Sequence, residues 1–410
     1  MPRYRSYHLH LPHLQVDHDK DLMVLYFMRI ARDIVNQTTF FFMPIFLYKT
    51  GQLLLDGVSF ISTPLEAGFL AIAGYYLIAR LSMMVTGIPL GRWSRSVGLQ
   101  RAFLFSDLFR SLLFAIFFFV SFQPWLLLAA AVVDGLQANL FWNNYYTVLS
   151  RHAHKHNVGK DLGLLQTTLQ IVSALAPAIG GLLAAVFGFS TLFLFALAAS
   201  LFSIIIVFKL SVKVIHDQVS YKEFFKWLKE PRFERLALSF VGQYINDATL
   251  FLWPLYVFLV LGAVDKVGYL YTASLLMALV FSFLIGVYVD KHKSKKPFVA
   301  SGGMLSLLWL ARTQVATIWG IAAVDMVEKL TSSFHWLFFE STVLRRSKGN
   351  QVFSYFVYRE VIRSATAVIF WLVVFGLFLF TSSWTAVFLL AAMAVLFSLL
   401  ITDKSHPGKV

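Results

Sequence analysis

Two apolar stretches of this sequence begin with side chains that could bind a solute or a proton. Asn36 and Gln37 begin the first stretch, and Asn246 and Asp247 begin a similar one 210 residues further on. Polar groups inside a membrane-spanning helix are costly, and they commonly mark binding sites or ion pathways. A carboxyl that alternates between dry and wet surroundings changes its affinity for protons, which couples protonation to conformation. Asp247 is therefore a candidate proton site.

Two further acids compete for this role, but both have cations nearby on the same predicted helix. Asp33 could instead form a static pair with Arg29 or Arg32. Glu328 could pair with Lys329 or with a cation of another helix. Asp247 has no cation within one helical turn, so it is our first choice for the proton site.

Other charges in apolar surroundings also require partners. Arg359 and Arg363 lie one turn apart, so they need Glu360, an acid of another span or an anionic substrate. Asp107 and Arg110 have the spacing of a pair on one helix. Arg312, near the end of its apolar run, is expected to extend toward the membrane surface.

The elements that must position these residues are long apolar helices. The chain has 410 residues, of which 58% are hydrophobic and 14% charged, whereas a soluble chain is about 45–50% apolar and 25% charged. About 20 apolar residues suffice to cross a bilayer. Twelve runs of about this length are predicted, at about 22–48, 66–90, 101–122, 124–149, 162–187, 189–210, 234–260, 267–289, 297–317, 318–344, 351–380 and 384–402.

Basic residues gather in alternate loops between these runs, for example at Arg92, Arg95 and Arg101. Loops rich in Lys and Arg face the cytoplasm, so we expect both termini on that side. The expected parts are a tail (1–21), a six-helix bundle (22–210), a cytoplasmic linker with an amphipathic helix (211–233), a second six-helix bundle (234–402) and a tail (403–410).

A loop motif occurs once in each half of the chain. Gly286–Lys291 has the pattern Gly-x-x-x-Asp-Lys, with Asp290 as the acid, and Gly87–Arg92 has the same pattern with Gly91 in place of the acid. With these repeats the chain resembles the major facilitator superfamily over about residues 22–402. In the family the acid is thought to lock the closed cytoplasmic side by its charge. Without it in the first half, either this lock rests on Asp290 or it is weaker on the N-terminal side.

A second motif lies in the fifth run. Ala176-Pro177-Ala-Ile-Gly180-Gly181 resembles the antiporter motif of the same family, with Ala176 replacing its first Gly. Small residues let helices approach closely, and a proline bends a helix. The motif favours export.

The resemblance implies an all-α polytopic membrane protein with twelve transmembrane helices in two pseudo-symmetric six-helix bundles. In this family spans 1, 4, 7 and 10 line a central cavity. Their polar residues are the candidates for substrate or ion binding: Arg29, Arg32, Asp33, Asn36, Gln37, Asp134, Gln137, Asn246, Asp247 and Glu328. The candidates for gating are Gly87, Arg92, Pro177, Gly180, Gly181, Gly286, Asp290, Lys291, Arg359, Glu360 and Arg363.

The resemblance also implies a function. We expect a monomeric secondary transporter of a small solute in the cell (inner) membrane, working by alternating access, coupled to protons and exporting amphipathic compounds. One alternative is an importer or facilitator of a small polar or anionic metabolite, using Arg29 or Arg32. A different one is a membrane receptor or scaffold that kept the fold without transport.

Several classes are excluded by the sequence. There is no cysteine, so thiol catalysis and Cys metal sites are absent. No phosphate-binding Gly-Lys-Ser/Thr loop, Gly-x-Ser-x-Gly elbow or HExxH helix occurs, which argues against an enzyme and against ATP-driven transport. No metal or cofactor is expected. The net charge of +14 lies in loops between apolar runs, which argues against nucleic acid as a partner.

Overall fold

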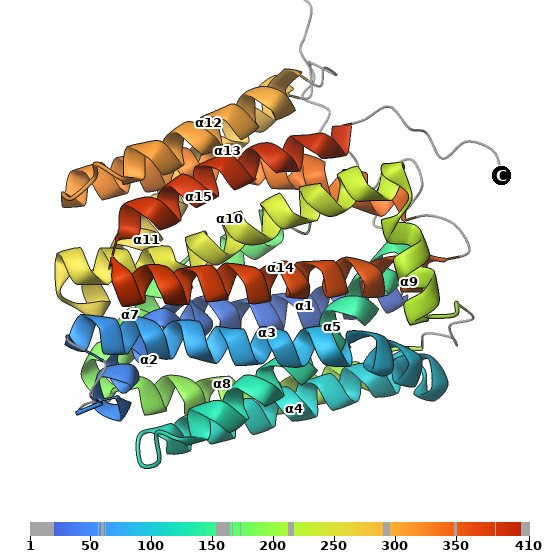
Figure 1. Ribbon diagram of the computed structural model, residues 1–410, viewed down its shortest axis with the longest axis horizontal. Helices are drawn as coiled ribbons and strands as arrows, with labels where there is room; N and C mark the ends of the chain where they lie inside the picture. The colour runs from blue at the N-terminus through green and yellow to red at the C-terminus, as the bar shows by residue number, and fades with distance from the viewer. Residues whose placement is uncertain are drawn as a thin grey trace, which may run out of the picture.

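In the computed structural model the chain is a bundle of long helices. The structure describes residues 20–402, with gaps at 56, 59–60, 62, 153–164, 166, 173, 212–216, 290–295, 348–350 and 382. Within these residues it contains no strand. The helices run roughly along one direction, and a short helix, α9 (Tyr221–Leu228), crosses one end of the bundle (Figure 1). We call this end of the molecule the α9 end.

The helices follow the predicted apolar runs closely. The first half contains α1 (Lys20–Thr38), the 3-10 helix η1 (Phe40–Phe42), α2 (Met43–Leu54), α3 (Pro64–Val97), α4 (Leu99–Val120), α5 (Leu126–His152), α7 (Ala176–Phe187) and α8 (Phe189–Val207). The second half contains α10 (Pro231–Leu261), α11 (Val264–Val289), α12 (Lys296–Arg312), α13 (Ile318–Arg346), α14 (Val352–Phe380), α15 (Trp384–Phe397) and η2 (Ser398–Thr402).

Local chemistry explains several helix boundaries. The hydroxyl of Thr63 accepts a hydrogen bond from the backbone N–H of Glu66 at the start of α3, and Ser220 caps α9 in the same way. Such caps satisfy N–H groups that lack a partner within the helix. Gly262 follows α10 with φ +73°, a conformation that glycine adopts without strain.

Eight helices in the described part of the chain are long and apolar enough to cross a membrane. They are Pro64–Val97, Leu99–Val120, Leu126–Arg151, Thr167–Phe187, Phe189–Val207, Phe233–Leu261, Val352–Phe380 and Trp384–Ile401. The helix α1 is less apolar because it carries Arg29, Arg32 and Asp33 besides two charges in its first turn. Twelve spans are compatible with this arrangement and stay a prediction.

The first predicted span, 22–48, is not one continuous helix. It breaks after Thr38 and resumes at Met43. Pro44 lies in the first turn of α2, where a missing N–H breaks no helical hydrogen bond. The matching proline of the second half, Pro254, lies inside the unbroken helix α10. The two similar stretches therefore have different backbones.

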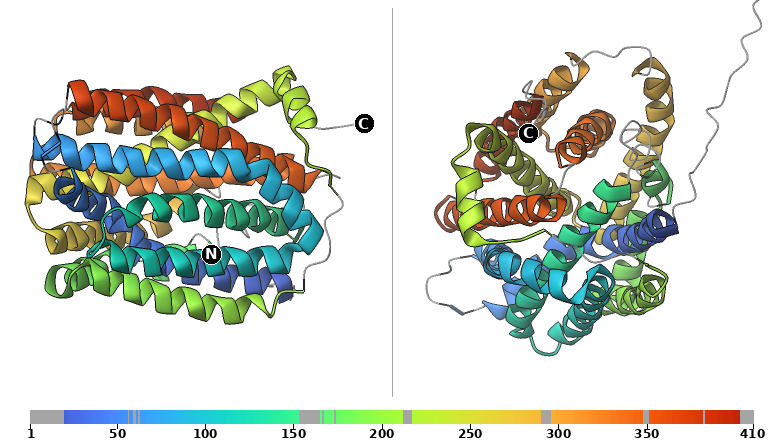
Figure 2. Two further views of the ribbon diagram at one scale, coloured as in Figure 1. Left: turned by 60° about the horizontal axis from the view of Figure 1, so that its bottom comes forward. Right: turned by 90° about the vertical axis from the view of Figure 1, so that its right-hand side faces the viewer.

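The two halves of the chain pack against each other through α3 with α14 and through α7 with α11 (Figures 1 and 2). Glycines allow close contact along both pairs. A Cβ on Gly91 of α3 would lie 3.1 Å from Val357 of α14. A Cβ on Gly268 of α11 would lie 2.3 Å from the carbonyl oxygen of Pro177. At the end opposite α9, Phe69 stacks on Phe378 with ring centroids 3.8 Å apart.

Candidate functional site

A cavity of about 500 Å³ lies between the two halves of the chain. Two adjoining cavities of about 300 and 330 Å³ share the side chain of Gln37 with it. The polar side chains that line the central cavity are Arg32, Asn36, Gln37, Arg80, Arg110, Asp134, Gln137, Gln243, Asp247, Glu360, Arg363 and Ser364. Its aromatic lining consists of Phe40, Phe41, Tyr76, Trp142, Tyr146, Tyr244, Phe251 and Trp371.

On the side of the first half, a chain of polar contacts connects α1, α4 and α5. Arg32 donates a hydrogen bond to the side-chain oxygen of Gln137 and lies 3.7 Å from the carboxylate of Asp107. The amide nitrogen of Gln137 donates to Asp134 at 2.8 Å. Tyr75 donates to the other carboxylate oxygen of Asp134 at 3.4 Å. The carboxylate of Asp134 is thus bound by neutral donors.

Two arginines of the cavity have no carboxylate partner among the described residues. Arg110 donates to the side-chain oxygen of Asn36 at 3.0 Å, so it does not form the predicted pair with Asp107, which lies beside Arg32 instead. Arg80 contacts the sulfur of Met83 at 3.3 Å, and its buried Nε atom has no hydrogen-bond partner.

On the side of the second half, two carboxylates share one guanidinium. Arg363 lies 3.3 Å from Asp247 of α10 and 3.9 Å from Glu360 of its own helix. Arg363 also donates to Gln243 at 2.7 Å. The side chain of Asp247 is 41% exposed, and that of Glu360 is 6% exposed. Asp247 therefore faces the cavity, but it is not the isolated acid that its own helix suggests.

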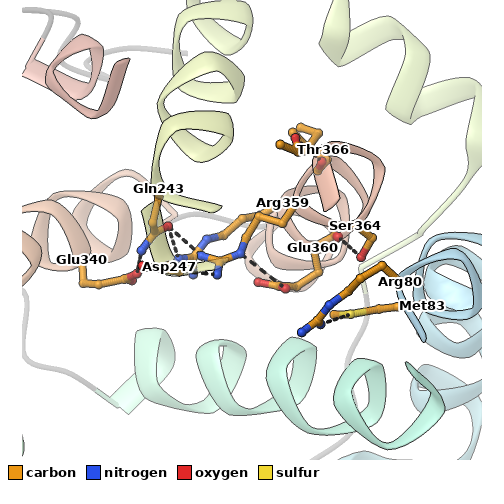
Figure 3. A network of polar contacts seen from close by, with 11 residues as sticks. Arg80, Met83, Gln243, Asp247, Glu340, Arg359, Glu360, Ser364 and Thr366 are labelled. Carbon is orange, nitrogen blue, oxygen red and sulfur yellow. Dashed lines mark hydrogen bonds and ion pairs between the residues drawn. The ribbon is translucent and has the colours of Figure 1, made fainter. Parts of the chain in front are cut away.

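A second pair lies beside this group. Arg359 is fully buried and lies 2.7 Å from Glu340 of α13, an acid of the tenth predicted span. Gln243 connects the two sites, since it donates to Glu340 at 2.7 Å and accepts from Arg359 at 3.2 Å. The side chains point toward one another, and Arg80 of α3 points toward the same network (Figure 3). The guanidinium of Arg359 also lies over the ring of Tyr146 in the other half, 4.4 Å from its centroid.

The remaining binding candidates form local pairs or lie in the core. Arg29 lies 3.4 Å from Asp33, and both line the cavity of about 300 Å³. Lys329 lies 3.1 Å from Glu328, as the adjacent positions allow. Asn246 is buried and accepts a hydrogen bond from Trp309 at 2.9 Å.

The gating candidates of the first half lie at contacts between helices. A Cβ on Gly87 would lie 2.8 Å from Val361 of α14. Arg92 donates to the backbone oxygen of Val219 in the linker at 2.9 Å. The position Gly91, where the family usually has Asp, packs against a valine, so van der Waals contact replaces a charge there.

The other gating candidates lie on α7 and α11. Pro177 lies in the first turn of α7, within the candidate span Thr167–Phe187. A Cβ on Gly180 would lie 2.2 Å from the carbonyl oxygen of Thr38, and one on Gly181 would lie 3.0 Å from that of Val264. Gly286 belongs to α11. Two further candidates, Asp290 and Lys291, lie outside the described residues.

Arg80 is the functional candidate that sequence reasoning missed. One signal could have found it, because Arg80 is the single charged residue in the interior of the apolar run 66–90. A lone cation at such depth needs an explanation of its own.

Comparisons with known proteins identify the family of the chain. A family model described as "Major Facilitator Superfamily" matches residues 25–324. The chain belongs to this superfamily. Membership and the apolar helices make the protein an integral membrane protein and a secondary transporter of small molecules. Members of the superfamily are generally not enzymes.

Solved structures show the same fold. The chain is similar to the crystal structure of the human organic anion transporter MFSD10 (TETRAN), with 11% sequence identity and a TM-score of 0.68. The match covers 93% of this chain and 99% of the other. No curated protein sequence matches the chain.

Proposed function

We propose that this protein is a proton-coupled transporter whose halves, residues 22–210 and 234–402, alternate about the central cavity. The observation that carries the proposal is the group of Asp247, Glu360 and Arg363. Two carboxylates around one cation leave a surplus negative charge within this group, and the side chain of Glu360 is only 6% exposed. An unbalanced buried charge is strongly unfavourable, so binding of one proton stabilises this group.

Alternation makes such a group useful for coupling. A ligand shifts a conformational equilibrium only as far as its affinity differs between the two states. The distance from Arg363 to Asp247 depends on the packing of α10 against α14, whereas Glu360 lies on the same helix as Arg363. Both helices belong to the second half, so alternation of the halves acts on this group by changing how far Asp247 is exposed to water, and that changes its affinity for the proton.

The solute and the direction of transport are supported by separate features. The aromatic rings of the central cavity suit an amphipathic solute, and the motif Ala176–Gly181 supports export. The alternative, a polar or anionic solute, is supported by Arg80 and Arg110, which have no acid partner among the described residues. A cavity of about 500 Å³ favours transport over a receptor with a filled core.

The proposed topology follows the basic loops. Arg92, Arg95 and Arg101 belong to the α9 end, which we place in the cytoplasm together with both termini. The membrane is the cell (inner) membrane, and the working unit is one chain.

The test begins with a thermal-shift screen of purified protein against metabolites and drugs, since ligands that bind the folded state raise its stability. The stabilising ligand is then followed into liposomes under an imposed proton gradient. We expect the gradient to drive flux through the wild type, and Asp247→Asn to abolish this dependence. Glu234→Gln removes an exposed carboxyl of the same helix and is the control. Flux that ignores the gradient in all three proteins would refute the coupling.

A further inference from the structure

The buried charges of the described residues fall into balanced and unbalanced groups. Most form one-to-one ion pairs, which are neutral as units: Arg29–Asp33, Arg32–Asp107, Arg312–Asp325, Lys329–Glu328 and Arg359–Glu340. A neutral pair can remain unchanged throughout a transport cycle. The charge of a solute must therefore be balanced by the charged side chains that do not belong to such pairs.

Two unbalanced groups remain, and both line the central cavity. On the side of the first half lie two guanidinium groups, Arg80 and Arg110, with one carboxylate, Asp134. On the side of the second half lie one guanidinium group, Arg363, and two carboxylates. The first group carries one surplus positive charge and the second one surplus negative charge. The charges of the two groups therefore sum to zero, and Arg80 of the first group points toward the network of the second (Figure 3).

We propose that the cavity binds a monoanionic organic solute at Arg80 and Arg110, and takes up one proton at Asp247 or Glu360 together with it. The inference rests on the proposed proton coupling and names its substrate class. An anion alone would neutralise the arginines and leave the two acids with an uncompensated negative charge. The proton converts one carboxylate into a carboxylic acid and restores neutrality.

The chemistry of the first group suits a carboxylate or a sulfonate. A guanidinium group presents planar N–H donors that match such oxygen pairs. Arg80 forms no ion pair with a carboxylate among the described residues and contacts the sulfur of Met83, so its charge can be balanced by the anion. Asp134 accepts hydrogen bonds from Gln137 and Tyr75, and its negative charge balances one of the two arginines. One positive charge remains in this group, which favours a monoanion over a dianion.

The apolar part of the solute has a surface of its own. Tyr76 stacks on Trp371 at 4.8 Å between ring centroids and meets the edge of Phe251 at 5.0 Å. All three rings line the cavity beside Arg80. An aromatic or aliphatic body can pack there while the anionic group reaches the arginine.

The charged groups around Asp247 leave one position for the proton. From α14 it lies 3.3 Å from Arg363, which also pairs with Glu360, and Arg80 of α3 points toward the same network (Figure 3). From α13 come Glu340, which Arg359 neutralises, and the neutral pair of Lys329 with Glu328. The only surplus negative charge among these described groups is the second carboxylate around Arg363. Binding of anion and proton is therefore mutually favourable, as linkage requires. Joint binding moves the anion and the proton in the same direction.

The first experiment measures binding to the purified full chain. Benzoate, phenylacetate and benzenesulfonate are compared with benzamide, phenylacetamide and benzenesulfonamide by thermal shift. We expect at least one anion, and none of the neutral amides, to raise the Tm. Arg80→Gln should weaken binding roughly 10- to 100-fold, because a hydrogen bond to a charged group is lost. Arg80→Lys should retain part of it, and the exposed Arg101→Gln all of it.

The second experiment measures protons in weakly buffered solution with a pH indicator. Benzenesulfonate is a strong acid anion and carries no proton itself. We expect its binding to the wild type to take up about one proton per molecule bound. Asp247→Asn and Glu360→Gln each remove the surplus negative charge, so they should bind the anion without proton uptake. These two variants keep the test valid if Arg80→Gln fails to fold.

The outcomes separate this inference from the proposed function. The proposed substrate class is overturned if the amides raise the Tm as much as the anions do. It is also overturned if no compound of the panel raises the Tm. If a neutral ligand from the wider screen is then transported in response to the proton gradient, the proposed function stands alone. Anion binding without proton uptake in the wild type overturns the joint binding. If Arg80→Gln and Arg101→Gln bind the anion equally well, the proposed anion site at Arg80 is overturned.

Discussion

Arg312 shows how a single residue can depend on a distant helix. It was expected to extend toward the membrane surface, but its side chain is 1% exposed. It lies 3.3 Å from Asp325 of α13, and its guanidinium lies 4.5 and 4.2 Å from the ring centroids of Trp253 and Trp309. The expectation was wrong because a carboxylate and two aromatic faces satisfy the charge inside the bundle.

Removal of one partner from this pair should be more damaging than removal of both. Asp325→Leu leaves the guanidinium buried without an anion, which we expect to cost about 3–5 kcal/mol. The double variant Arg312→Met/Asp325→Leu should recover a large part of that loss, because it leaves no buried charge. Thermal unfolding of the purified variants measures both. A double variant less stable than the single one would show that the pair itself stabilises the fold.

At the scale of elements, the break between α1 and α2 is the feature that distinguishes the first half. Helix α7 packs directly against it, since a Cβ on Gly180 would lie 2.2 Å from the carbonyl oxygen of Thr38 and 2.9 Å from the ring of Phe42. Backbone contact at this distance leaves no room for a side chain. The glycine of the antiporter-like motif is thus explained by packing, whatever its role in gating.

Gly180→Ala should test this contact. The added methyl group overpacks a backbone contact, and we expect a loss of about 1–3 kcal/mol with a lower Tm. Gly303→Ala in α12 is the matched control, because a Cβ there meets nothing within 4 Å and alanine favours a helix by up to about 1 kcal/mol. Equal Tm changes in the two variants would contradict the account.

At the scale of the whole molecule, the α9 end joins the two halves without a charge lock at Gly91. Tyr358 of α14 donates to the backbone oxygen of Ser220 at 3.1 Å, and Ser150 of α5 lies 2.7 Å from Ser347 across the halves. Asp217 of the linker accepts from the N–H of Phe353 at 2.6 Å. Hydrogen bonds of the linker and close packing of α3 on α14 therefore hold this end together.

A bulky residue at Gly87 should separate the halves at the α9 end. The natural chain has no cysteine, so spin labels can be attached at Ser96→Cys and Glu234→Cys without further changes. In Gly87→Trp we expect longer label distances than in the wild type, because its Cβ would already lie 2.8 Å from Val361.

The matched control for this measurement is Gly74→Trp on the same helix, where a Cβ meets nothing within 4 Å. Its distance distribution should equal that of the wild type. A shift of the same size in both tryptophan variants would mean that the close contact at Gly87 does not hold the halves together.

The sequence by itself determined the helices, their apolar character and the family. It also indicated Arg29 or Arg32 as the partner of Asp33, and Lys329 or a cation of another helix as the partner of Glu328. The structure shows Arg29, four residues from Asp33 as the period of a helix favours, and the adjacent Lys329. The sequence showed that the stretch beginning at Asn36 carries polar residues, but it did not predict the helix break after Thr38. Pro44 in the first turn of a helix and Pro254 inside a helix look the same in sequence.

Only the tertiary structure decided how the other charges are balanced. Arg363 and Asp247 are 116 residues apart, and nothing local indicates that α10 and α14 bring them together. The same holds for Arg80 and Arg110, whose lack of an acid partner is visible only once every other described carboxylate has been placed. Electrostatic energy depends on distance in space, so the charge of the cavity is a property of the folded molecule.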